Sequence, residues 1–145
     1  MALNDAEAAQ LIGQGVTAVL DLTAEFSSAR PFAEVAYLNL PILDLTAPTR
    51  GQLDRTIAFI TEQLERGTVY VHCKIGYSRT ATVVACYLLA SGRARTPDEA
   101  MDLLRSARPT IVIRPEARAA IIDYARTNPP RQDEANPSAC SASRS

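Results

Sequence analysis

One cysteine and one arginine, six positions apart, are the residues of this chain best placed to do chemistry. Cys73 and Arg79 enclose five residues, and the apolar segment that follows them is typical of a helix. A loop that ends on a helix can turn its backbone N–H groups toward one centre, where the helix N-terminus adds positive dipole. Residues 73–79 therefore predict a cradle for an oxyanion.

The side chains at the two ends of this loop supply a nucleophile and a clamp. Converging N–H dipoles and the Arg79 charge favour the thiolate of Cys73, and a thiol in such surroundings titrates at about 3.5–7.5 instead of about 8.5. The planar guanidinium of Arg79 can bind two phosphate oxygens at once, which a lysine cannot do. A thiolate that faces a clamped phosphorus is arranged for in-line attack and a phosphocysteine intermediate.

The residues around this pair resemble the CX5R signature of the cysteine-based protein phosphatases. His72 precedes the cysteine, Gly76 lies inside the loop, and Ser78 and Thr80 place hydroxyls on either side of the arginine. Over roughly residues 2–126 the chain is similar to the compact dual-specificity branch of that superfamily. The resemblance implies a metal-independent phosphatase that hydrolyses phosphomonoesters.

The same resemblance implies roles for the other loop residues. His72 would hold the loop through hydrogen bonds and help to keep the thiol ionised, although a histidine at a strand end can also be purely structural. The Thr80 hydroxyl would hydrogen-bond the cysteine sulfur and ease its departure from phosphorus, and Ser78 would tie the loop to itself. The predicted phosphate-binding residues are those between the nucleophile and the start of the helix: Lys74, Ile75, Gly76, Tyr77, Ser78 and Arg79.

A phosphocysteine mechanism also needs an acid that protonates the leaving oxygen from the opposite side of the phosphorus. Asp44 is the candidate, because its loop follows a strand that can lie beside the Cys73 strand, and because the family places an aspartate shortly before a proline and a capped helix. Asp44 would later act as general base on water. The alternative is that Asp44 only caps a turn. For Asp21, which ends another strand, we favour turn capping over catalysis.

Apolar strands alternate with helices along the chain. Predicted strands run over residues 16–22, 35–40 and 69–71, and predicted helices begin near residues 5, 49, 79, 96 and 115. This alternation predicts an α/β domain with a mostly parallel central sheet flanked by helices, as in the dual-specificity phosphatases. In such sheets the ligand crevice lies beyond the carboxyl ends of the strands, where the Cys73 loop begins.

Two features of the C-terminal part complete the predicted organisation. In the last helix, we expect Ala119, Ile122 and Tyr124 on the buried face. Residues 1–127 form the predicted phosphatase domain, and residues 128–145, rich in Asn, Pro, Ser and Arg, form a tail that we expect to be disordered. Family domains generally open with one or two strands before the first helix, so the chain is either a fragment that lacks upstream strands or a minimal member.

Composition argues against several other function classes. The net charge of −1 gives no footprint for nucleic acid, and the single histidine argues against a metallophosphatase, so neither a metal nor another cofactor is expected. Three cysteines, an odd number, fit a reducing compartment, and we expect a cytoplasmic protein. Cys86 fits an inert core position better than a redox partner of Cys73. No apolar run reaches the ~18 residues of a membrane span.

The substrate class is divided between proteins and lipids. Tyr77 resembles the protein-directed enzymes, and a short chain implies a shallow pocket that admits phosphoserine and phosphothreonine as well as phosphotyrosine. Lys74 resembles relatives that act on phosphoinositides and other phospholipids, but Tyr77 replaces their second basic loop residue. We favour phosphoproteins, with phospholipids as the alternative. Two further hypotheses are a rhodanese-like sulfurtransferase and a non-catalytic phosphate-binding module.

Overall fold

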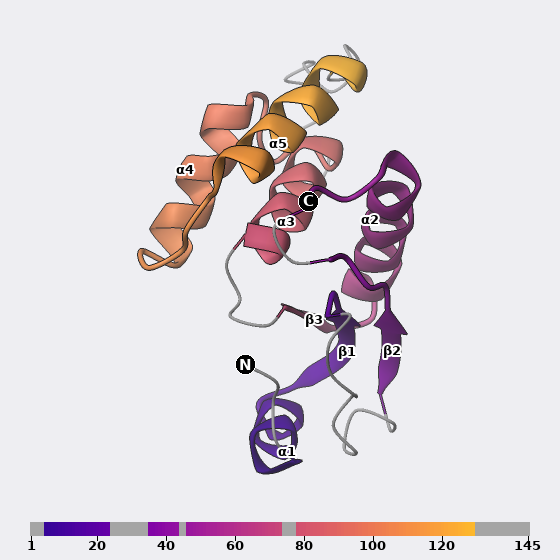
Figure 1. Ribbon diagram of the computed structural model, residues 1–145. Coiled ribbons are helices and arrows are strands. Elements are labelled where there is room, and N and C mark those ends of the chain that lie inside the picture. Colours follow the sequence, from indigo (N-terminus) through magenta and orange to yellow (C-terminus); the bar gives the residue numbers. More distant parts are fainter. Residues whose placement is uncertain (1–4, 24–34, 44–45, 74–77, 130–145) are drawn as a thin grey trace, which may run out of the picture.

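The computed structural model describes residues 5–23, 35–43, 46–73 and 78–129 (Figure 1). The elements follow in the order α1 (Asp5–Gly13), β1 (Val16–Asp21), β2 (Ala36–Asn39), α2 (Arg50–Leu64), β3 (Thr68–His72), α3 (Ser78–Ala90), α4 (Pro97–Ala107) and α5 (Pro115–Thr127). The predicted α/β class is confirmed, because parallel strands and helices alternate through the first half of the chain.

The described strands form one three-stranded sheet in the order β2-β1-β3, and both strand pairs are parallel. Five of the six residues of β1 are buried, as expected for a middle strand that is covered on both faces. The register places Asp21 between Asn39 of β2 and His72 of β3. Three polar side chains therefore meet at the carboxyl end of the sheet.

The strand order corrects one expectation about the candidate acid. The choice of Asp44 assumed that its strand can lie beside the Cys73 strand, but β2 pairs with β1, which separates it from β3. The segment after β2 continues this ladder, since the Ile42 amide donates to the Leu22 carbonyl at 3.1 Å. Parallel strands need crossover connections, and the crossovers of this chain leave the first strand in the middle.

Helices cover the two faces of the sheet unequally. In Figure 1, α2 to α5 lie on one side and α1 lies on the other. Leu20 belongs to the large core formed with α2 to α5, whereas its neighbour Val19 belongs to a small core with Ala8 of α1. The two residues face opposite sides because side chains alternate along a strand. Within the described residues, no helix has both the length and the apolar character that a membrane span requires.

Helix α3 lies among the other helices, α2, α4 and α5, on the same side of the sheet (Figure 1). It packs against α2, α4 and α5, and eight of its 13 residues are buried. Gly92, with φ at 76°, follows its last turn, where the Ala94 amide donates to the Leu88 carbonyl at 3.0 Å. Because α3 is fixed on several sides, its first turn can hold functional side chains in one place.

The buried face of α5 differs from the prediction. Ala117, Ile121 and Tyr124 are buried, whereas Ala119 is exposed and Ile122 is 44% exposed. The sequence has alanine at both 119 and 120 and isoleucine at both 121 and 122, so two helix faces are about equally apolar. Packing against α3 and α4 selects between them, and a pattern within one helix cannot encode that contact.

The two neighbouring isoleucines of α5 offer a matched test of this packing. We expect Ile121→Ala to lower the free energy of unfolding by about 2–5 kcal/mol, since it leaves a cavity in a fully buried site. Ile122→Ala should cost much less, about 0.5 kcal/mol, because Ile122 is 44% exposed and its removal leaves no enclosed cavity. Urea unfolding of both variants measures the difference, and equal losses would contradict the assigned face.

Candidate active site

Cys73 lies directly after β3, at the carboxyl end of the sheet. It is 5% exposed, and the hydroxyl of Thr80, in the first turn of α3, donates a hydrogen bond to its sulfur at 3.2 Å. A hydroxyl that donates to sulfur stabilises the thiolate form, and the positive end of α3 acts in the same direction. The structure thus brings together the predicted nucleophile and the predicted hydroxyl.

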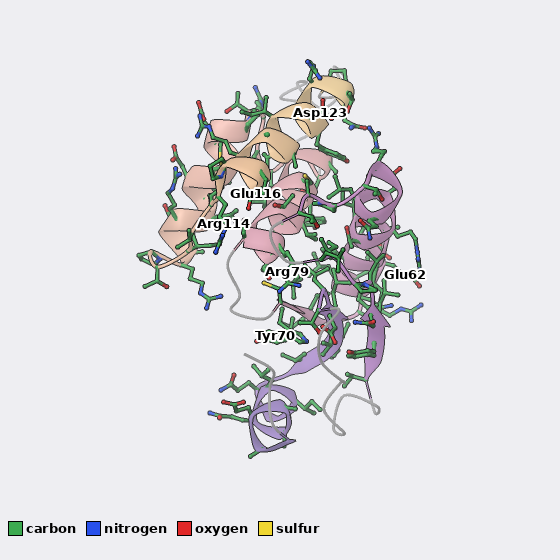
Figure 2. The ribbon with its side chains drawn as sticks, viewed as in Figure 1. Glu62, Tyr70, Arg79, Arg114, Glu116 and Asp123 are labelled. Atoms are coloured by element: carbon green, nitrogen blue, oxygen red, sulfur yellow. The ribbon has the colours of Figure 1, made fainter. Side chains whose placement is uncertain are left out.

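Arg79 precedes Thr80 in the first turn of α3 and is 3% exposed. Figure 2 shows it at the foot of that helix, close to the sheet. One terminal guanidinium nitrogen donates to the carbonyl of Ile42 at 2.8 Å. Ile42 stands two residues before Asp44 in the chain, so this bond connects the arginine of the predicted phosphate loop to the segment that carries the candidate acid.

His72 is the last residue of β3, and it is held between a ring and a carboxylate. Its imidazole stacks on Tyr70 with ring centres 5.6 Å apart, and its Nε2 lies 3.5 Å from Oδ1 of Asp21. Burial lowers the pKa of His72, and the Asp21 carboxylate opposes that shift only in part. The imidazole is therefore uncharged at neutral pH.

Asp21 caps a turn as the sequence predicts, and it also has a contact with the site that the sequence did not predict. Its Oδ1 accepts hydrogen bonds from the amide of Thr23 at 2.9 Å and from its hydroxyl at 2.6 Å, which is the turn cap that the sequence predicted. Its Oδ2 accepts a hydrogen bond from the hydroxyl of Tyr37, and its approach to His72 had no counterpart in the prediction. Only the register of β1 against β3 could have revealed that approach.

Several predicted site residues lie outside the described residues. These are the candidate acid Asp44 and four residues of the phosphate loop, namely Lys74, Ile75, Gly76 and Tyr77. Ser78 is described as the first residue of α3, where its carbonyl accepts a hydrogen bond from the Thr82 hydroxyl at 2.9 Å. The phosphate-binding roles of these residues stay predictions.

Cys86 lies two turns further along α3 and is fully buried. Burial raises the pKa of its thiol to about 12, although the charge of Arg50 opposes the shift. Cys86 belongs to the large hydrophobic core together with Tyr124 of α5. Burial raises the pKa of Tyr124, and the charge of Cys86 adds to that shift. A thiol with that pKa is protonated at pH 7, which fits the interpretation as an inert core cysteine.

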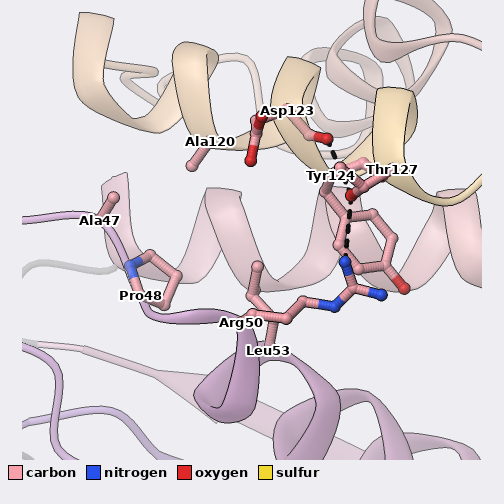
Figure 3. Close-up of a pocket in the computed structure, with 8 residues that line it drawn as sticks. All are labelled: Ala47, Pro48, Arg50, Leu53, Ala120, Asp123, Tyr124 and Thr127. Atoms are coloured by element: carbon pink, nitrogen blue, oxygen red, sulfur yellow. Dashed lines mark hydrogen bonds between the residues drawn. The ribbon is translucent and has the colours of Figure 1, made fainter.

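A cavity of about 370 Å³ separates the start of α2 from α5 (Figure 3). Ala47, Pro48 and Tyr124 are among the residues that line it. Arg50 spans the gap, since its guanidinium lies 5.4 Å from the centre of the Tyr124 ring and donates to the Thr127 hydroxyl at 3.0 Å. This contact fixes the beginning of α2, the helix that follows the predicted acid loop.

Comparisons with known proteins agree with this arrangement. The model of the family "Dual specificity phosphatase, catalytic domain" matches residues 2–127. The chain is 32% identical over 123 residues to phosphatidylglycerophosphate phosphatase PTPMT2 of Arabidopsis thaliana, with 80% of this chain and 54% of that protein covered. It is 34% identical over 108 residues to dual specificity protein phosphatase 12 of Mus musculus, with 72% and 32% covered.

A solved structure extends the likeness to three dimensions. The crystal structure of Tk-PTP in the active form superposes with a TM-score of 0.77 at 26% sequence identity, and the match covers 87% of this chain and 88% of that one. By contrast, the chain spans about half the length of the Arabidopsis relative and about a third of the mouse relative.

Proposed function

Because the chain belongs to the dual specificity phosphatase catalytic-domain family, we propose that it is a cysteine-dependent phosphatase that hydrolyses phosphomonoesters through a phosphocysteine intermediate. The observation that carries this proposal is the hydrogen bond from the Thr80 hydroxyl to the Cys73 sulfur, with buried Arg79 in the same helical turn. The predicted nucleophile thus contacts the first turn of α3, which also carries the predicted phosphate clamp.

In the first step, the Cys73 thiolate attacks phosphorus while Arg79 binds two of its non-bridging oxygens. The S–P bond forms as the bond to the ester oxygen breaks, and Asp44 gives that oxygen a proton. In the second step, water attacks phosphorus and transfers a proton to Asp44. The S–P bond breaks, phosphate leaves, and Cys73 returns as a thiolate that the Thr80 hydroxyl stabilises.

The substrate class is divided more evenly than the sequence suggested. A phosphatidylglycerophosphate phosphatase and a dual specificity protein phosphatase both match the chain at similar identity. The comparisons therefore do not favour phosphoproteins over phospholipids, and we propose phospholipid headgroups as an equally good candidate substrate. We also propose a reducing compartment such as the cytoplasm, because the mechanism requires Cys73 to stay a free thiolate.

The proposed function is tested by phosphate release with and without a chelator. We offer phosphotyrosine and phosphothreonine peptides, phosphoinositides and phosphatidylglycerophosphate to the wild-type protein, and we expect release that the chelator does not reduce. The preferred substrate then decides between proteins and lipids. Release that the chelator abolishes would contradict the metal-independent mechanism.

Two other outcomes would favour the remaining hypotheses. A persulfide on Cys73 after incubation with thiosulfate, detected by mass spectrometry, would favour the sulfurtransferase. Binding of a phosphopeptide without any turnover by the wild-type protein would favour the non-catalytic binding module.

A further inference from the structure

A buried carboxylate lies one strand away from the nucleophile, and the proposed mechanism does not use it. Asp21 ends β1 and is 1% exposed, in register with His72 of β3. An ionised carboxylate is costly to bury unless several hydrogen-bond donors surround it. A turn cap alone could be made at the surface, so the complete burial of Asp21 calls for another explanation.

Donors from two segments orient the Asp21 carboxylate. The Thr23 amide and hydroxyl donate to Oδ1 at 2.9 and 2.6 Å, and the Tyr37 hydroxyl on β2 donates to Oδ2. With both oxygens engaged, the group cannot rotate freely. In this orientation Oδ1 lies 3.5 Å from Nε2 of His72.

This orientation selects one tautomer of His72. An ionised carboxylate can only accept hydrogen bonds, so the ring nitrogen that faces it is stabilised when it carries a proton. Burial lowers the pKa of His72 and favours the neutral ring, which has one proton to place. That proton belongs on Nε2, and Nδ1 keeps a lone pair. Tyr70, stacked on the ring, fixes its plane.

In this tautomer Nδ1 is the ring nitrogen that can accept a hydrogen bond. Nδ1 is bonded to the ring carbon that joins the side chain, so of the two nitrogens it lies nearer to the backbone that continues into Cys73. A neutral nitrogen acceptor there can receive a backbone N–H, whereas the opposite tautomer would present a second donor at that position.

We propose that Asp21 is a positioning residue of the phosphatase reaction, which keeps the proton of neutral His72 on Nε2 and thereby sets the backbone at Cys73. The inference rests on the proposed function for its consequence, since the position of Cys73 decides the geometry of attack on phosphorus. A displacement of about 1 Å in such a group can cost about 100-fold in rate.

His72 is the only histidine of the chain, so its tautomer can be measured directly. A long-range ¹H–¹⁵N spectrum contains one imidazole, and we expect the wild-type protein to carry its proton on Nε2. Asp21→Leu removes the acceptor, and we expect the Nε2 preference to be lost. Asn39→Ala is the matched control. The Asn39 side chain also contacts residues 21 and 23, but it donates to the backbone carbonyls of Asp21 and Thr23 and not to the carboxylate, so the tautomer should not change.

Asp21→Asn keeps the size of the side chain and removes its charge, so it keeps the proposal testable if the leucine variant fails to fold. The Asp21 carboxylate raises the pKa of His72 against burial, so we expect that pKa to fall further in Asp21→Asn and to stay unchanged in Asn39→Ala. An Nδ1–H tautomer in the wild type, or a His72 pKa that Asp21→Asn does not move, would overturn the proposal.

A second readout reports on the nucleophile without needing turnover. The cysteines 73, 86 and 140 lie on separate tryptic peptides, residues 67–74, 80–93 and 132–144, so the alkylation rate of Cys73 can be followed alone. We expect its pH profile to shift in the Asp21 variants, and kcat/KM to fall about 10- to 100-fold. An inactive wild type would refute the proposed function, whereas an unshifted alkylation profile would refute the role of Asp21.

Discussion

Replacing Cys73 with serine should reduce phosphate release to background while substrate binding remains. A serine hydroxyl is not ionised at neutral pH, so the variant has no anion to attack phosphorus. The guanidinium of Arg79 stays in place, because it is held by its bond to the Ile42 carbonyl, which does not involve the sulfur. Release assays and equilibrium binding of the preferred substrate measure the two properties separately.

Cys86→Ala is the matched control for this experiment. It removes the other described free thiol, which is fully buried and whose pKa of about 12 keeps it protonated. Release should therefore persist, apart from a modest loss of stability from the smaller side chain. Substantial release by Cys73→Ser would remove Cys73 from the role of nucleophile, and loss of release in Cys86→Ala would reopen a role for the second thiol.

Local patterns were sufficient to predict most of the fold. The apolar runs at 16–22 and 35–40 became β1 and β2, shortened by one or two residues, and the proline and capping residues around Thr96 correctly marked the start of α4. The face of α5 was wrong because Ile121 and Ile122 are equivalent within the helix. Only the neighbouring helices distinguish the two, as their different burial shows.

The candidate site shows the same difference between contacts that are local in the chain and contacts between distant residues. Cys73, Arg79 and Thr80 lie within eight residues of each other, so a motif could place them together, and the contact between Thr80 and Cys73 agrees with the prediction. The contacts of Asp21 with His72 and of Arg79 with the Ile42 carbonyl join residues 51 and 37 positions apart. Such contacts depend on strand order and register, which apolar periodicity does not determine.

The strand order affects how the candidate acid, Asp44, can approach the predicted phosphate loop. β1 lies between the strand that leads to Ile42 and the strand that leads to Cys73. The chain after β2 therefore has to pass over the end of β1 to reach the phosphate loop, and the bond from Arg79 to the Ile42 carbonyl spans this distance. The same arrangement places Asp21 at the end of β1, in register with Asn39 of β2 on one side and with His72 of β3 on the other.

The role proposed for Asp44 predicts a loss that depends on the leaving group. We expect Asp44→Asn to lower kcat/KM by about 10²–10⁴-fold for phosphothreonine, because the departing alkoxide needs a proton that the amide cannot give. Aryl phosphates with acidic phenols should lose much less, since their phenoxides leave without protonation. The basic limb of the pH profile of kcat/KM, where an acid would lose its proton, should also disappear in the variant.

A surface aspartate provides the control for this chemical change. Asp54 on α2 is exposed and pairs with Arg50 at 3.1 Å, a contact worth about 0–1 kcal/mol, so Asp54→Asn should leave kcat/KM unchanged for every leaving group. If Asp44→Asn lowers kcat/KM equally for alkyl and aryl phosphates, proton donation is not the step that it affects. Asp44 would then be a residue that caps its turn, and the acid would have to come from another side chain or from water.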